Sequence, residues 1–108
     1  MTTSIPGTAV IRVSRGNFDP ASFAEVERMT NETGSYLIPA ISRLGGLLGY
    51  YACASPDGSI VHVSIWKSEE HAQQMTKLKE MIVDARSQAE AAGVEFIPIV
   101  NYPVSWHI

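Results

Sequence analysis

An imidazole and an indole lie four residues apart in the segment SIVHVSIW, which spans residues 59–66. The segment alternates in the manner of a β-strand, so His62 and Trp66 project from the same face. Histidine titrates near neutral pH and can take a phenolic proton, and a flat indole can stack on an aromatic ring. The pair therefore indicates either one wall of a binding pocket or two large side chains that fill a core.

Four further residues are candidates for binding or catalysis. Tyr50 and Tyr51 are neighbours in the strand-like segment LLGYYACA, so they project to opposite faces. We expect one of them to pack in the core and the other to face a pocket or a subunit contact. Met75 suits a core and equally a pliable apolar pocket wall. Arg86 is either a solvated helix residue or a group that binds an anion or a quinone oxygen.

Metal, nucleotide and disulfide signatures do not accompany these residues. No second histidine, cysteine or carboxylate is spaced to join His62 in a metal site. The sequence has no glycine-rich phosphate loop, nucleophile elbow or Cys-x-x-Cys pair. We therefore expect neither a metal nor a cofactor. The single cysteine, Cys53, lies in an apolar run and is expected to be a buried structural thiol.

Length and composition indicate one ordinary globular domain over residues 1–108, with 45% hydrophobic and 18% charged residues. The net charge is −3 and the sequence has no basic stripe, which argues against a nucleic-acid partner. No apolar run approaches the length of a membrane span. The N-terminal segment MTTSIPGT lacks the features of a signal peptide, so a cytoplasmic protein is expected.

The elements that would position the candidate residues follow from periodicity and turn chemistry. Alternating side chains predict four strands, at 8–15, 47–54, 60–66 and 95–104. The turn residues 56–59 join the second and third strands into a hairpin. The last strand contains Pro98 and Pro103, so it must lie at a sheet edge or carry a bulge.

Helices are predicted within each half of this pattern. The first begins at Asp19 and is interrupted at Gly34, and a short second helical piece follows with Pro39 in its first turn. After the hairpin, Ser68 caps a helix whose apolar residues recur every three or four positions, for about six turns, until Gly93.

This order predicts an α+β fold, the ferredoxin-like βαββαβ sandwich, with two crossover helices on one face of a four-stranded antiparallel sheet. Both faces of residues 60–66 carry large side chains, and one chain covers only one face. A homodimer that packs sheet against sheet, as in a dimeric α/β barrel, would cover the other. The aromatic tail with Tyr102, Trp106 and His107 is expected to reach the partner subunit or to cover the pocket.

The segment GGLLGYYACASPDGSIVHVSIWKSEEHA, residues 45–72, resembles the antibiotic-biosynthesis-monooxygenase-like domains of the dimeric α/β-barrel superfamily. The resemblance implies a cofactor-free oxidation of polycyclic phenols to quinones. It also implies that Trp66 matches a strand-end tryptophan that lines the substrate pocket. His62 stands where those enzymes have an asparagine, Ala72 where they have a tyrosine, and Arg86 could correspond to a basic residue of the long helix.

Haem-degrading relatives share the strand-end tryptophan but use a histidine of the long helix and an asparagine of the first strand. In this sequence His71 comes too early in the helix and the first strand offers no asparagine. These two departures from the haem-degrading relatives disfavour haem degradation.

Two functions remain open at this point. The first is a cofactor-independent, monooxygenase-like oxidoreductase for a small or polycyclic aromatic phenol or quinol. His62 and Arg86 would be catalytic, and Trp66, a tyrosine of the second strand and Met75 would bind the substrate. The second is a non-catalytic, ligand-binding or stress-responsive dimer in which His62 completes a core network.

Overall fold

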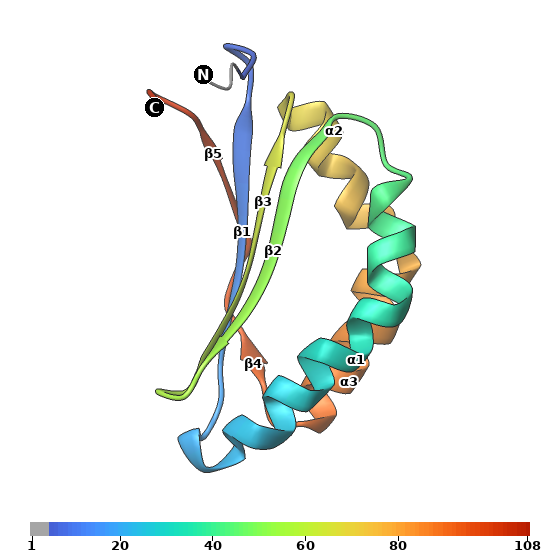
Figure 1. Ribbon diagram of the computed structural model, residues 1–108, viewed down its shortest axis with the longest axis vertical. Coiled ribbons are helices and arrows are strands. Elements are labelled where there is room, and N and C mark those ends of the chain that lie inside the picture. Colours follow the sequence, from blue (N-terminus) through green and yellow to red (C-terminus); the bar gives the residue numbers. More distant parts are fainter. Residues whose placement is uncertain (1–4) are drawn as a thin grey trace.

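Helices cover only one face of an antiparallel sheet in this protein (Figure 1). The computed structural model describes residues 5–108, so the first four residues of the N-terminal segment lie outside it. The elements are β1 (Val10–Asn17), η1 (Pro20–Ser22), α1 (Phe23–Ser42), β2 (Leu47–Ser55), β3 (Ser59–Trp66), α2 (Glu69–Gln73), η2 (Gln74–Lys77), η3 (Glu80–Ala85), α3 (Arg86–Ala91), β4 (Glu95–Phe96) and β5 (Val100–Pro103).

The sheet has the predicted ferredoxin-like topology. Its strand order is β2-β3-β1-β4, with β5 also paired to β1, and every pairing is antiparallel. The hairpin β2–β3 is confirmed: Gly58 adopts a φ of 103°, and its N–H donates to the carbonyl of Ser55. The predicted last strand is divided around Pro98 into β4 and β5, which both lie at the edge of the sheet, as proline requires.

The first helix is continuous, and the predicted interruption at Gly34 is wrong. α1 runs for 20 residues through both Gly34 and Pro39. Its buried positions, from Val26 to Ile41, keep helical spacing along the whole length, so packing against the sheet outweighs the glycine. Pro39 lies on the exposed side of the helix, where water can satisfy the carbonyl that loses its partner.

The predicted six-turn helix after Ser68 is divided instead. Ser68 caps α2 as expected, with its hydroxyl accepting from the His71 N–H. The chain then passes through a 3₁₀ turn, becomes extended at Leu78 with a ψ of 105°, and continues as the π-helical η3 and as α3. No glycine or proline marks this break. It changes the helical phase, so Ile82 is exposed while Met81 turns toward the sheet.

Two core clusters lie between the sheet and the helices, one at each end of β3. Trp66 belongs to the first, and Ile60 belongs to the second. His62 and Ser64 project from the same face of β3, between those two residues. The polar side chains of His62 and Ser64 therefore lie between two apolar clusters. The hollows between the sheet and the helices lie at this level of the sheet.

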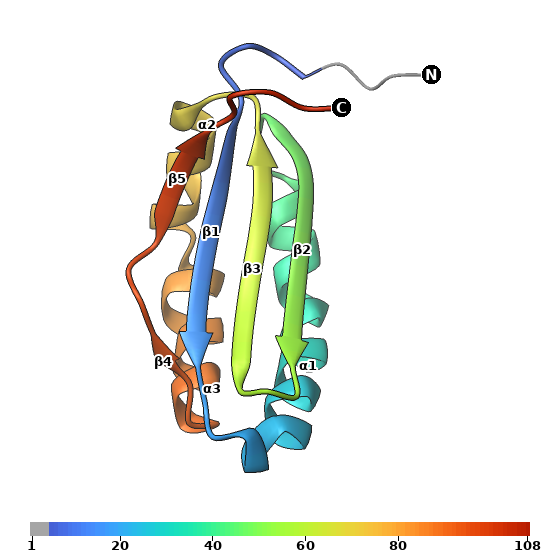
Figure 2. The ribbon, with the colours of Figure 1, turned by 90° about the vertical axis from the view of Figure 1, so that its left-hand side faces the viewer.

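The other face of the sheet is uncovered, as Figure 2 shows from that side. Val61, Val63 and Ile65 are only half-buried there, and Tyr51 is exposed. Cys53 lies on this face, opposite Val61, and is exposed, so the prediction of a buried thiol is wrong for the single chain. None of the described helices is long and apolar enough to cross a membrane.

Candidate functional site

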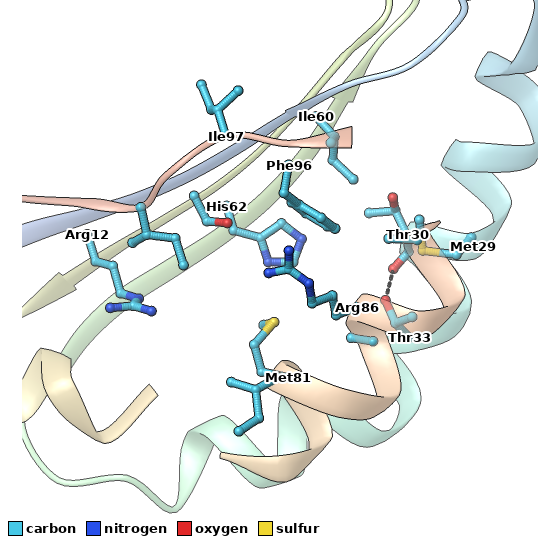
Figure 3. Close-up of a pocket in the computed structure, with 15 residues that line it drawn as sticks. Arg12, Met29, Thr30, Thr33, Ile60, His62, Met81, Arg86, Phe96 and Ile97 are labelled. Atoms are coloured by element: carbon cyan, nitrogen blue, oxygen red, sulfur yellow. Dashed lines mark hydrogen bonds between the residues drawn. The ribbon is translucent and has the colours of Figure 1, made fainter. Parts of the chain in front are cut away.

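Three hollows meet at His62, between the sheet and the helices. The first, here called the helix–sheet cavity, measures about 90 Å³ and lies among β1, α1, β3, η3, α3 and β4. The second, the α1–β2 hollow, measures about 390 Å³, and the third, the small cavity, about 30 Å³. His62 lines all three, and Figure 3 shows its ring among the labelled side chains of the helix–sheet cavity.

The imidazole of His62 is largely buried and is held by one specific partner. Its Nδ1 lies 2.6 Å from the hydroxyl oxygen of Tyr50, and the two rings meet edge to face. Burial lowers the pKa of His62 from 6.5 to about 4, so the ring is neutral at pH 7. A neutral imidazole carries one N–H and one basic nitrogen. When Nδ1 carries the hydrogen and donates to the Tyr50 oxygen, Nε2 is the basic atom left for a ligand.

Tyr50 is the tyrosine that faces the helices. Its neighbours across the sheet are Ser64 on β3 and, one strand further, Arg12 on β1. Burial raises the pKa of the Tyr50 hydroxyl above its usual range, an effect that the positive charge of Arg12 partly opposes. The hydroxyl therefore keeps its proton at neutral pH, and its oxygen can accept a hydrogen bond from His62 Nδ1–H.

Trp66 shares the face of His62, as the alternation predicted, but lies in the core. It is fully buried, and its indole Nε1–H donates to the hydroxyl of Ser64 over 2.8 Å. It does not line any of the three hollows at His62. Met75 is also buried in this cluster, yet it forms part of the wall of the small cavity.

Of the other two candidates, Tyr51 lies outside the hollows and Arg86 lies beside one of them. Tyr51 is 58% exposed on the uncovered face, so the strand places it away from the hollows that its neighbour lines. Arg86 lies at the rim of the helix–sheet cavity, with its guanidinium 5.0 Å from the centre of the Phe96 ring. It also forms an exposed pair with Glu90 at 3.7 Å, which partly neutralises its charge.

Polar residues of β1 and β5 that were not predicted as candidates lie on the same face of the sheet as His62. Arg12 and Ser14 project toward the helices and line both the helix–sheet cavity and the small cavity. Asn101 of β5 is directly opposite Arg12, so it lies on the same face. A signal was present, because Arg12 and Ser14 fall in the alternation of the buried Val10, where apolar residues are usual.

Two further polar side chains, those of His71 and Tyr36, have local partners. His71 Nδ1 forms a hydrogen bond with the Ser68 hydroxyl, at 2.8 Å. The Tyr36 hydroxyl donates a hydrogen bond to the side-chain oxygen of Gln88. Within residues 5–108, no group of three or more histidine, cysteine or carboxylate side chains is arranged to hold a metal ion.

Comparison with known proteins identifies the fold. No family model and no curated protein matches the sequence. Among solved structures, a mutant of SnoaB, a cofactor-independent oxygenase from Streptomyces nogalater, is 14% identical, with a TM-score of 0.68 over 94% of this chain and 97% of that one.

Two further structures are similar to the same extent. A candidate antibiotic biosynthesis monooxygenase from Deinococcus radiodurans is 15% identical, with a TM-score of 0.68 over 92% of this chain and 95% of its own. A dimeric ferredoxin-like protein from an uncultured marine organism is 19% identical, with a TM-score of 0.66 over 94% and 92%. At such identities the likeness establishes the fold alone, the ferredoxin-like α+β fold that this chain shares with these structures.

Proposed function

We propose that this chain, which has the fold of a cofactor-independent oxygenase, is itself a monooxygenase-like oxidoreductase for a small or polycyclic aromatic phenol or quinol. One observation carries the proposal. A neutral, largely buried imidazole lines the hollows between the sheet and the helices, and it is oriented by a tyrosine hydroxyl. An oriented base beside an apolar cavity is the arrangement that abstraction of a phenolic proton requires.

The proposed reaction begins with proton transfer to His62 Nε2. In the imidazolium that results, Nδ1–H donates to the Tyr50 oxygen, and a bond to a charged donor contributes about 1.5–3 kcal/mol. The electron-rich anion then passes electrons to dioxygen. For an anthrone-like substrate a C–O bond forms at the ring carbon, one oxygen atom is retained in the quinone, and the other leaves as water with two substrate hydrogens.

The low pKa of His62 restricts the substrate. A phenol of pKa about 10 and a base of pKa about 4 differ by about six units, or about 8 kcal/mol of unfavourable proton transfer. Attraction between imidazolium and phenolate in a cavity of low dielectric offsets part of this cost. Met81 and Met29 give the cavity the necessary apolar wall. We therefore expect substrates with a more acidic hydroxyl to react fastest.

The test is oxygen uptake with anthrone-like and naphthoquinol substrates. His62→Ala should lower the enzyme-dependent rate at least a hundredfold, because general-base catalysis typically contributes a factor of about 10²–10⁴. His107→Ala removes an exposed imidazole from the C-terminal tail and should keep the wild-type rate. Circular dichroism must show that both variants are folded. Wild-type rates in the His62→Ala variant would refute the proposed base.

Two observations favour a non-catalytic binding function. Trp66 fills the core rather than a cavity wall, and the Tyr50 hydroxyl already satisfies one nitrogen of His62. Under this alternative the wild-type protein binds aromatic ligands but consumes no oxygen with any phenol or quinol.

We also propose that two copies of the chain pair through the uncovered face of the sheet. The half-buried Val61, Val63 and Ile65 form an apolar strip along the central strand β3, and a strip of this kind is costly to leave in water. A solved structure with this fold is described as dimeric, which supports the proposal.

A further inference from the structure

Arg12 is a buried cation without an acidic partner. Its residue is 7% exposed, near the middle of β1. None of the ion pairs among residues 5–108 involves it, because those pairs join other arginines and lysines to surface carboxylates. Burial lowers the pKa of its guanidinium, although a nearby Tyr50 opposes the effect. A guanidinium nevertheless keeps its proton in proteins, so the charge has to be stabilised in another way.

The neighbours of Arg12 in the sheet do not supply that stabilisation. Ser64, opposite it on β3, already accepts a hydrogen bond from the Trp66 indole. Asn101, opposite it on β5, has a buried Oδ1 with no hydrogen-bond partner, so this oxygen does not bind the guanidinium either. An available acceptor one strand away is therefore left unused.

The side chain of Arg12 is directed instead toward the hollows. It lines both the helix–sheet cavity and the small cavity, and Figure 3 shows it extending from β1 toward the helices, on the same side of the sheet as His62. The rest of the helix–sheet cavity is largely apolar, with Met81, Phe96 and Ile97 among its walls. A buried cation at the end of an apolar space fits a ligand with an aromatic body and an anionic oxygen.

We propose that the ligand of the helix–sheet cavity is an aromatic acid, whose carboxylate binds Arg12 while its ring lies against the apolar wall near His62. This inference rests on the proposed function, because it specifies the substrate class of the same site. Arg12 and the carboxylate would form the bidentate pair for which guanidinium geometry is suited. Arg86 at the rim is exposed and already paired with Glu90, so it is the weaker candidate for this contact.

The experiment compares aromatic acids with alcohols of nearly the same shape. Calorimetric titration of the wild-type chain uses benzoate against benzyl alcohol and 2-naphthoate against 2-naphthylmethanol. At least one acid should bind tenfold or more tightly than its alcohol. Equal affinity within both pairs, or no binding of either acid, would overturn the proposal without recourse to any variant.

Substitutions then assign the preference to Arg12. Arg12→Met keeps an apolar side chain of similar length, and should weaken binding of the acid at least tenfold while leaving the alcohol unchanged. Arg28→Met removes an exposed arginine of α1 and is the matched control. If Arg12→Met does not fold, Arg12→Lys retains the charge without the planar fork and should show an intermediate loss. A folded Arg12→Met or Arg12→Lys variant that binds the acid as the wild type does would show that the residue only supports the sheet.

These titrations need no turnover, so they separate this inference from the proposed function. A preference for acids without any oxygen uptake would leave the binding assignment intact and refute the proposed monooxygenase reaction. Oxygen uptake lost in His62→Ala, with no preference for acids in the wild type, would do the reverse.

Discussion

The hydrogen bond between His62 and Tyr50 joins two groups whose pKa values burial shifts in opposite senses. Burial lowers the pKa of the imidazole and raises that of the hydroxyl, so both groups are neutral over a wide range around pH 7. A neutral pair can be buried at a modest cost if its hydrogen bond is made. The same burial makes protonation of His62 unfavourable in the folded state, so the stability of the fold depends on pH.

At the residue scale we therefore expect stability to fall in mild acid. Between pH 6.5 and about 4 the unfolded chain binds a proton at residue 62 and the folded chain does not, so the free energy of unfolding decreases as the pH falls. A shift from 6.5 to about 4 corresponds to about 3 kcal/mol. Urea denaturation from pH 4 to 7 measures this loss in the wild type and in His62→Gln, which has no titrating group there. Parallel pH profiles for the two proteins would contradict the burial of a neutral His62.

Among the elements, α1 shows most clearly how packing overrides local preference. Gly34 and Pro39 are both unfavourable within a helix, by about 1 and about 3 kcal/mol respectively. The helix nevertheless continues, because buried residues on both sides of Gly34, such as Met29 and Leu37, hold it against the sheet. Continuity matters for the site, since Thr30 and Thr33 precede Gly34 and line two of the hollows at His62.

This continuity makes Gly34→Ala a stabilising substitution. The added methyl group meets no atom closer than 3.5 Å, which is ordinary contact, and alanine favours a helix interior. We expect the free energy of unfolding to rise by about 0.5–1 kcal/mol in chemical denaturation. Gly93→Ala is the control: it also meets nothing nearby, but its φ of 95° is strained for alanine, so it should destabilise by about 1 kcal/mol. Destabilisation by both would mean that α1 is interrupted at Gly34.

For the whole molecule, the decisive feature is that one layer of helices covers a sheet with two apolar faces (Figures 1 and 2). The uncovered face also explains the exposed thiol of Cys53 and the exposed ring of Tyr51. Both residues alternate with the inward side chains of β2, so they become buried only if something packs on that face. A second copy of the chain is the partner we propose.

Val63→Glu tests this pairing, because it puts a charge at the centre of the uncovered face. Burial of an unpaired carboxylate at an interface is costly, so the dimer should dissociate. Light scattering after gel filtration should show the molar mass falling from twice 11.8 kDa to 11.8 kDa. Val83→Glu introduces the same change at an exposed position of η3 and should keep the wild-type mass. A monomeric wild type, or a dimeric Val63→Glu variant, would contradict the proposed interface.

Features that depend on neighbouring residues were predictable. The hairpin follows from alternation on both sides of a turn with glycine at its left-handed position, and the cap of α2 follows from Ser68. The shared face of His62 and Trp66 follows from the pleat alone. The order of the elements then restricts the topology to a ferredoxin-like sheet, because connections are short and a helical segment crosses over before and after the central hairpin.

Which candidate residues line a hollow and which lie in the core depends on distances between segments far apart in the sequence. Periodicity gave the same weight to Tyr50 and Tyr51, and it could not separate a tryptophan in the core from one at a cavity. The partner of Tyr50, the isolation of Arg12 and the break at Leu78 all arise where β1 and β3 meet the helical segments that follow Ser68. Local pattern specifies the face on which a side chain lies, whereas packing of the layers sets which side chains touch, because close packing is satisfied by all the segments together.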